Sequence, residues 1–315
     1  MLKIVFMGSP EFAVPTLEAL VADPRCQVCA VITQPDKPAG RGRLMTPPAV
    51  KPCAETHAIP CYQPPILKTP EMFDLLTSLA PDFFVTIAYG KILRQSFLDI
   101  PRLAPLNLHA SLLPKYRGAA PIQWAVMQGE TTSGVCLMRM DAGMDTGPVY
   151  VRQAIDLASS ETSATLHEKL AALSAQILIQ NIHGIAEGSL IPVPQDGEPS
   201  AAPMLQKSHG YIHFDTDAHA LDARCRGLFP WPTAVVTYQA KRISLHMTHA
   251  LETHTSSLPG TILGLCPDTN ALLVACKQGI LAIHTLQPEG KKPMDAKSFF
   301  HGYHPLGERF LPWGS

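Results

Sequence analysis

Short apolar runs alternate with helical patterns through the first third of the chain. Four runs have the length and composition of strands: residues 3–8, 27–33, 82–88 and 105–109. Helical spacing appears between them, after Pro10 and around 49–58 and 70–79. The strand-like runs are almost entirely apolar, as strands buried on both faces of a parallel sheet are. The alternation predicts a Rossmann-like, open and mostly parallel α/β sheet.

The pattern changes further along the chain. Residues 133–140 and 148–155 predict two more strands, and 162–187 predict a long amphipathic helix. A stretch with four prolines and no period follows at 190–206, which indicates a linker. Beyond it, turn signals separate short strand patterns at 233–238, 241–247, 261–264, 271–275 and 280–286. We predict an α/β domain at 1–189, a linker at 190–208 and a small all-β barrel at 209–315.

Composition excludes several classes of protein. The chain has 315 residues and a formal net charge of -1, so bulk charge does not indicate a nucleic-acid partner. No apolar run reaches membrane-spanning length, and the N-terminus lacks the pattern of a signal peptide. Eight scattered cysteines indicate reduced, buried thiols. Cys26 and Cys29 have metal-ligand spacing without a second close pair, so we expect no metal site.

Missing motifs narrow the chemistry. The turn after the first strand holds one glycine, Gly8, where a dinucleotide site needs three, so we expect no NAD. Neither the serine-hydrolase elbow nor the phosphate-binding loop of ATP-dependent enzymes is present. Acyl or one-carbon transfer without a covalent protein nucleophile remains.

Asn107 and His109 stand two residues apart at the end of the fourth predicted strand. Strand side chains alternate, so both project from one face, at the edge where open α/β sheets bind ligands. An amide and an imidazole suit an oxygen that becomes negative in a tetrahedral transition state. The histidine needs a carboxylate to set its tautomer. We predict that Asp145, which lies between two glycines, has this role, whereas Asp141 caps a turn.

Two segments carry a resemblance to a known family. Residues 107–122 (NLHASLLPKYRGAAPI) and 140–147 (MDAGMDTG) resemble the folate-dependent formyltransferases. The resemblance implies 10-formyltetrahydrofolate as the formyl donor, with Asn107 and His109 steadying the oxyanion and Asp145 tuning the histidine. Lys115 stands where the family commonly has arginine. The stretch expected to bind the folate comprises Ser111, Leu112, Leu113 and Pro114.

Nearly the whole chain resembles those family members that act on initiator methionyl-tRNA. The matching segments are residues 1–20, 33–51, 229–232 and 261–294. This resemblance implies that the acceptor is the α-amino group of methionine on initiator methionyl-tRNA, used in translation initiation. It also implies that the C-terminal barrel is OB-like.

A basic insertion follows the second predicted strand. Lys37, Arg41, Arg43 and Lys51 oppose Asp36 alone, so four positive charges minus one leave +3 in a nearly neutral chain. We expect Lys37, Arg41 and Arg43 to contact tRNA phosphates or base edges, together with Lys207 just before the barrel. A solvated charged loop is the alternative.

Other activities remain open at this point. A formyltransferase for a sugar amine or for glycinamide ribonucleotide would share the catalytic set, as would a hydrolase of the formyl donor. A noncatalytic tRNA- or folate-binding protein could keep the fold. We expect a monomer in the bacterial cytoplasm.

Overall fold

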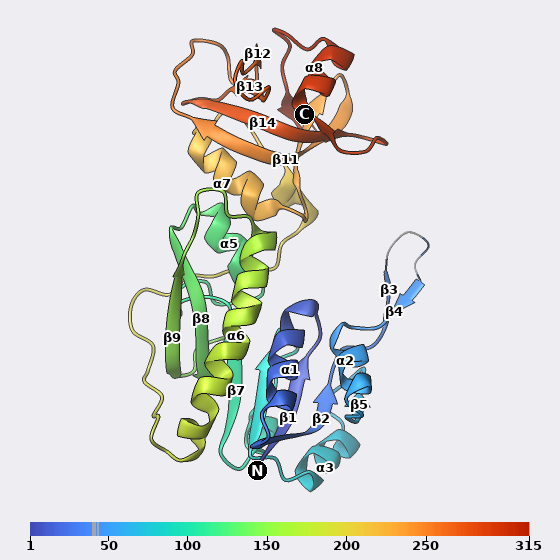
Figure 1. Cartoon of the computed structure of the whole chain (residues 1–315), viewed down its shortest axis with the longest axis vertical. Coiled ribbons are helices and arrows are strands. Elements are labelled where there is room, and N and C mark those ends of the chain that lie inside the picture. Colours follow the sequence, from blue (N-terminus) through green and yellow to red (C-terminus); the bar gives the residue numbers. More distant parts are fainter. Residues whose placement is uncertain (40–41, 43, 315) are drawn as a thin grey trace. The chain divides into compact units, whose positions relative to one another are not determined.

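The computed structural model describes residues 1–39, 42 and 44–314. These residues form two compact units (Figure 1). Unit 1 contains Met1–Pro121, Ser133–Ile155 and His167–Ala202. Unit 2 contains Ile122–Thr132, Asp156–Leu166 and the chain from Pro203 onward. No helix among the described residues is long and apolar enough to span a membrane.

A seven-stranded sheet forms the centre of unit 1, in the order β5-β2-β1-β6-β7-β8-β9. Neighbouring strands from β5 to β7 are parallel, and β8 runs antiparallel to β7. The prediction of a Rossmann-like, mostly parallel sheet is therefore confirmed. The strands are β1 (Leu2–Gly8), β2 (Cys26–Ile32), β5 (Cys61–Tyr62), β6 (Phe83–Ile87), β7 (Ala104–His109), β8 (Thr132–Arg139) and β9 (Val149–Asp156).

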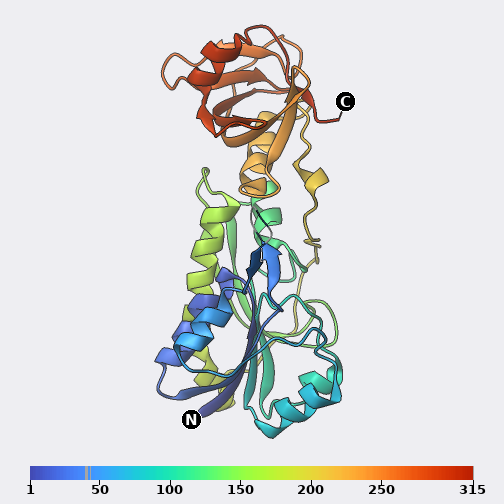
Figure 2. The same cartoon turned by 90° about the vertical axis from the view of Figure 1, so that its right-hand side faces the viewer.

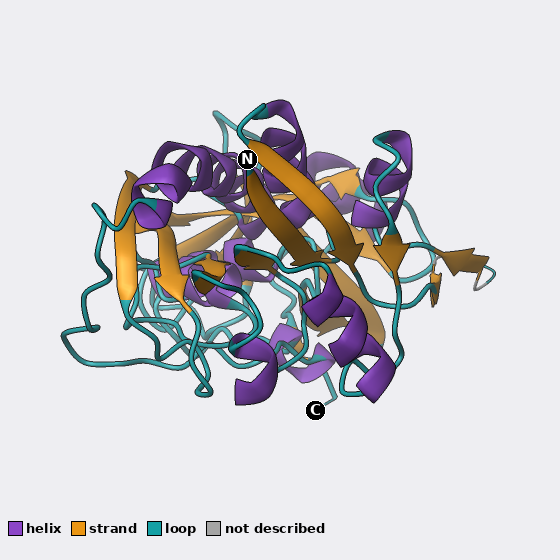
Figure 3. Ribbon diagram, turned by 90° about the horizontal axis from the view of Figure 1, so that it is seen from below, coloured by secondary structure: helices purple, strands orange, loops and turns teal. Residues whose placement is uncertain are grey.

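Helices cover both faces of this sheet (Figures 2 and 3). On one side lie α1 (Val14–Ala22), α2 (Val50–Thr56) and the unit 1 part of α6 (Ser163–Ala186). On the other side lie α3 (Pro70–Ser78) and α4 (Gln95–Leu98). Alternate β1 residues Val5 and Met7 share a buried cluster with Leu76 of α3 and Phe97 of α4. Burial of both faces explains why the run at 82–88, which contains β6, is nearly all apolar.

The basic insertion contains a short hairpin. Strands β3 (Lys37–Ala39) and β4 (Leu44–Thr46) pair in antiparallel fashion, with Lys37 opposite Thr46. The hairpin lies apart from the seven-stranded sheet in the view of Figure 1 and is separate from it in its strand pairing. Arg41 and Arg43, which the sequence predicts to contact tRNA, lie outside the described residues.

Unit 2 is built on an antiparallel sheet in the order β12-β13-β14-β11-β10-β16, with β15 also paired to β14. The sheet curls into a half-barrel (Figure 2). Tyr238 packs edge-on against Phe299 and Phe310 inside it. The strands are β10 (Ala234–Tyr238), β11 (Lys241–Leu251), β12 (Ile262–Leu265), β13 (Leu272–Ala275), β14 (Ile280–Pro288), β15 (Met294–Asp295) and β16 (Leu311–Pro312).

Unit 2 also contains helices that the all-β prediction omitted. They are α7 (Ala218–Leu228) and α8 (Ala296–Tyr303). All of α5 (Pro121–Met127) except its first residue also belongs to unit 2. Each of the first two begins at an aspartate whose carboxylate accepts backbone N–H groups: Asp217 for α7 and Asp295 for α8. Each aspartate is a helix-start signal that stands in the sequence directly before the helix that it caps.

The Pro-rich segment differs from the predicted linker at 190–208. Its first part, 190–202, belongs to unit 1. Val193 and Val149 exchange two backbone hydrogen bonds, at 2.8 and 2.9 Å, and the Ala202 N–H donates to the Arg117 carbonyl at 2.7 Å. Proline-rich composition concealed this attachment, because the segment pairs through isolated bridges rather than a regular strand. The α/β domain predicted at 1–189 therefore extends to Ala202.

Candidate active site

Strand β7 carries Asn107 and His109 to the carboxyl edge of the parallel part of the sheet. Asn107 lies opposite Thr86 of β6 and Met138 of β8, and His109 lies opposite Cys136. Two residues of one strand separated by a single residue share a face. Asn107 is partly exposed, whereas the His109 side chain is 7% exposed. The imidazole is therefore held rigidly, and the amide beside it remains accessible.

Asp145 approaches His109 from the loop between β8 and β9. Its Oδ1 lies 3.6 Å from His109 Nδ1, and its Oδ2 accepts a hydrogen bond from the Gly118 backbone N–H at 2.9 Å. The backbone of Asp145 is left-handed, with φ of 54°. A Cβ on Gly147 would lie 1.9 Å from the Arg139 carbonyl oxygen, so the loop needs glycine there.

The alternative carboxylate, Asp141, has a structural contact instead. Its Oδ1 accepts hydrogen bonds from the Gly143 N–H at 3.0 Å and from the Thr146 hydroxyl at 2.7 Å. This carboxylate closes the turn on which Asp145 stands. The structure thus brings Asp145, rather than Asp141, next to the imidazole.

Both ring nitrogens of His109 face oxygen acceptors. Nε2 lies 2.9 Å from the Tyr116 carbonyl oxygen, and Nδ1 faces the Asp145 carboxylate. A ring with a proton on each nitrogen donates to both, whereas a neutral ring turns one lone pair toward an oxygen. The Asn107 amide beside this ring can donate to a developing oxyanion, and a His109 N–H can do so when it turns from its present oxygen partner.

The four residues Ser111–Pro114 follow β7 and are held mainly by the core. Leu113 is 2% exposed and packs with Cys136, Met138 and Val149. Its N–H donates to Cys136 Sγ at 3.3 Å, and the Ser111 hydroxyl donates to the Lys115 carbonyl at 2.7 Å. Burial raises the pKa of Cys136 to about 11, so the thiol near the site stays protonated and is a poor nucleophile. Leu112 is the partly exposed member of the four.

The described basic residues of the insertion divide into two kinds. Lys37 is exposed on β3. Lys51 forms an ion pair with Asp36 at 3.2 Å, so these two charges cancel locally. Lys207 is exposed in the short 3-10 helix Lys207–Gly210 of unit 2. The excess of +3 in the insertion therefore comes from Lys37, Arg41 and Arg43.

Sequence reasoning missed two residues at the site. Arg117 lies in the loop after β7, and Gln195 lies in the Pro-rich segment. The Arg117 guanidinium donates to the Gln195 side-chain oxygen, and the Gln195 amide nitrogen donates to the Asp145 carbonyl. Arg117 was inside a quoted motif but had no assigned role. Nothing in spacing or composition marks Gln195.

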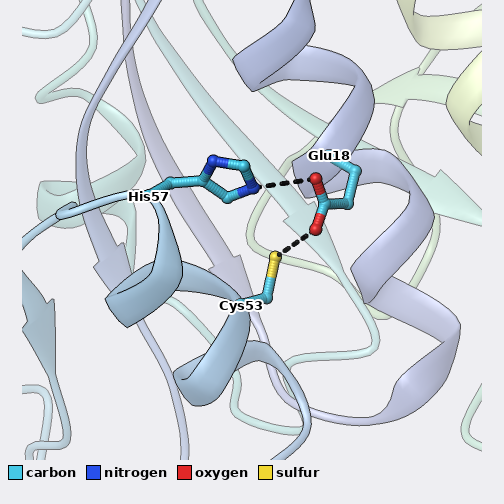
Figure 4. Close-up of side chains that lie close together, drawn as sticks. All are labelled: Glu18, Cys53 and His57. Carbon is cyan, nitrogen blue, oxygen red and sulfur yellow. Dashed lines mark hydrogen bonds and ion pairs between the residues drawn. The ribbon is translucent and has the colours of Figure 1, made fainter.

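Two groups of described residues have metal-ligand chemistry. Glu18, Cys53 and His57 meet between α1 and α2 (Figure 4). The Glu18 carboxylate accepts a hydrogen bond from the Cys53 thiol at 3.1 Å, and its other oxygen lies 2.8 Å from His57 Nε2. Burial, reinforced by that carboxylate, raises the pKa of Cys53 to about 12, whereas a metal would require the thiolate. The contacts fit a hydrogen-bonded link between two helices. Asp23, Cys26 and His183 form the second group, where Arg25 already holds the Asp23 carboxylate at 2.9 Å.

Comparison with known proteins places the chain in a class. The family model described as formyl transferase matches residues 2–182, and the one described as formyl transferase, C-terminal domain, matches residues 204–304. The chain belongs to the formyl transferase family.

Named relatives refine this placement. A methionyl-tRNA formyltransferase of Trichlorobacter lovleyi is 43% identical over 305 residues, which cover 96% of this chain and 95% of the relative. A solved N-formyltransferase of Helicobacter canadensis, in complex with folinic acid and dTDP-3-aminofucose, has a TM-score of 0.66 at 18% identity. It is covered over 98% of its length by 90% of this chain. HypX of Aquifex aeolicus in complex with tetrahydrofolic acid has a TM-score of 0.59 at 15% identity; 94% of this chain spans 46% of HypX. At such low identity these two structures support the fold alone.

Proposed function

We propose that this protein transfers the formyl group of 10-formyltetrahydrofolate to the α-amino group of methionine on initiator methionyl-tRNA. The observation that carries the proposal is the His109–Asp145 pair, 3.6 Å apart, beside Asn107 at the carboxyl edge of the sheet. The near full-length identity of 43% to a methionyl-tRNA formyltransferase supports the choice of acceptor.

The proposed reaction is a direct transfer. The methionine amine attacks the formyl carbon, and the formyl oxygen becomes an oxyanion beside the Asn107 amide and the His109 ring. Asp145 holds the ring and, through a water molecule, receives the proton that the amine loses. The bond from the formyl carbon to N10 of the folate then breaks, N10 takes that proton from Asp145 through the water molecule, and tetrahydrofolate leaves. Neither a metal nor NAD enters any step.

The segment after β7 is the proposed contact for the formyl donor. We propose that Ser111, Leu112, Leu113 and Pro114 contact the folate, mainly through the backbone and through Leu112, because the other three side chains are buried. A segment anchored in the core presents its peptide groups in fixed positions, which lowers the entropy cost of orienting the ligand.

The tRNA would be held by positively charged side chains. We propose contacts from Lys37, Arg41 and Arg43 in the insertion and from Lys207 in unit 2. An Arg41→Ala variant is expected to weaken use of tRNA with little change in donor affinity. Lys68→Ala, which removes one exposed positive charge elsewhere in unit 1, is the matched control. Equal tRNA kinetics for the two variants would contradict a role for the insertion.

We further propose that the protein acts as a monomer in the bacterial cytoplasm. Sedimentation of the protein with and without tRNA tests the first part: one copy per tRNA supports it, and a stable dimer opposes it.

Acceptor choice is tested by single-turnover formylation. The protein and 10-formyltetrahydrofolate are mixed with initiator methionyl-tRNA, elongator methionyl-tRNA, free methionine, a nucleotide-linked amino sugar or glycinamide ribonucleotide. Rapid formylation of the initiator tRNA alone is expected. Transfer to a small amine, or hydrolysis of the donor with no transfer to any acceptor, would instead support one of the rival activities.

A further inference from the structure

The Pro-rich segment is tied to the active-site loops at two points. Near its start, Val193 pairs with Val149 at the beginning of β9. Near its end, the Arg117 N–H donates to the Ser200 carbonyl at 2.8 Å, and the Tyr116 N–H donates to the Ser200 hydroxyl at 2.9 Å. The residues between these two attachments connect the start of β9 with the loop after β7. Gln195 is one of these residues.

Gln195 uses every hydrogen-bonding group of its amide on these loops. Its Nε2 donates to the Asp145 and Gly147 carbonyl oxygens, both at 2.8 Å. Its Oε1 accepts from Arg117, from Nη2 at 2.6 Å and from Nε at 3.2 Å. The neighbours fix the orientation of the amide, since carbonyl oxygens only accept and a guanidinium only donates.

These contacts bear on a strained piece of backbone. Asp145 adopts a left-handed conformation, which is unfavourable for a residue with a side chain. The Gln195 bonds hold the carbonyl of Asp145 and that of Gly147, on either side of Thr146. Any rotation of these peptides would swing the Asp145 carboxylate away from His109 Nδ1, now 3.6 Å distant. The charged Arg117 strengthens the hydrogen bonds from Gln195 to the two carbonyl oxygens, because it polarises the amide whose N–H groups donate.

We infer that Gln195, supported by Arg117, is a positioning residue for the formyl-transfer reaction. It touches no reacting atom and acts by fixing the Asp145 loop so that the carboxylate faces His109. The inference rests on the proposed function, since it assigns the carboxylate–imidazole pair to that chemistry.

A single-atom change gives a specific test. In Gln195→Glu one carboxylate oxygen can still accept from Arg117, but the other faces two carbonyl oxygens and repels both. The Arg117 guanidinium keeps this carboxylate ionised across the assay range, so the repulsion persists at every pH tested. Gln195→Ala makes none of these contacts at any pH. Gln27→Glu is the matched control, because it makes the same charge change at an exposed position near the amino end of β2.

The experiment measures kcat and KM for initiator methionyl-tRNA between pH 5.5 and 8, for wild type and each variant. Both Gln195 variants should lose about tenfold to a hundredfold in kcat with little change in KM, the size expected when a catalytic group shifts by about an ångström. The ratio of each Gln195 variant's kcat to the wild-type kcat should stay constant across this pH range, because neither substitution adds a group that titrates within it. Gln27→Glu should match wild type.

Other outcomes overturn the inference. Variants within twofold of wild-type kcat, or a loss confined to KM, would refute the positioning role while leaving the transfer activity established. If a Gln195 variant fails to fold by circular dichroism, Arg117→Lys decides: it keeps the charge but loses the two-pronged contact, and unchanged kcat refutes the inference. An inactive wild type in the same assay refutes the proposed function and the inference together.

Discussion

Replacing Asp145 by asparagine should remove most of the activity and leave the fold intact. The amide oxygen can still accept from the Gly118 N–H, which lies 2.9 Å from the present Oδ2, so the loop keeps its anchor. The amide nitrogen would then face His109 and donate to Nδ1. That contact requires a neutral ring, because Nε2 already faces the Tyr116 carbonyl and must carry the single remaining proton. The ring would keep a hydrogen-bonding neighbour but lose the negative charge beside it.

The contact that is lost sets the size of this effect. Asp145 Oδ1 lies 3.6 Å from His109 Nδ1 and orients the ring that we assign to the oxyanion. Loss of one oxyanion-hole donor costs about a hundredfold to a thousandfold in rate, or about 2.7–4 kcal/mol. We expect kcat to fall by the same factor.

The assay is single-turnover formylation at saturating donor and tRNA, with a thermal melt of each protein. Asp141→Asn is the matched control, since it makes the same change in the same loop at a residue that only closes the turn. The melting temperature of Asp145→Asn should stay within a few degrees of wild type. A rate within threefold of wild type would refute the electrostatic reasoning, as would an equal loss in Asp141→Asn.

Three further experiments, two substitutions and one thiol-labelling reaction, test other parts of the structure. Gly147→Ala should lower formyl-transfer rates more than tenfold and destabilise unit 1 by about 1–3 kcal/mol in urea unfolding, because a Cβ has no room against a backbone carbonyl; wild-type behaviour would contradict this packing. The Arg25 guanidinium holds the pKa of Asp23 well below its usual range, so this carboxylate adds stability above pH about 4 that is lost at lower pH. Asp23→Asn should therefore cost about 1–2 kcal/mol at pH 7 and progressively less below pH 4, and a deficit independent of pH would argue against the ion pair. The Thr269 hydroxyl and nearby N–H groups lower the pKa of Cys266, so it should be the first thiol to react with iodoacetamide in the folded protein, as mass spectrometry of partly labelled samples can show.

Much of the fold was predictable because the residues involved report their own environment. Residues 82–88 are nearly all apolar because helices cover both faces of β6, and this composition alone predicted a buried parallel strand. The two-residue spacing of Asn107 and His109 likewise predicted a shared face at a strand end. These are local signals that depend only on the period of the strand.

The parts that were missed depend on contacts between distant segments. Gln195 reaches Asp145 across 50 positions of the sequence, and its own segment is irregular, so neither period nor composition pointed to it. The ion pair between Lys51 and Asp36 likewise required the positions of two side chains that a charge count cannot supply. Long-range pairing of polar groups is fixed by the tertiary structure. For this reason the sequence pointed to the proposed catalytic residues more readily than to the residues that contact and orient them.

The most direct test of the account compares wild-type protein with His109→Ala in single-turnover formylation of initiator methionyl-tRNA by 10-formyltetrahydrofolate. The account predicts rapid transfer by the wild type and a rate about a hundredfold to a thousandfold lower in a variant that remains folded. A folded His109→Ala protein that keeps more than half of the wild-type rate would contradict the central claim.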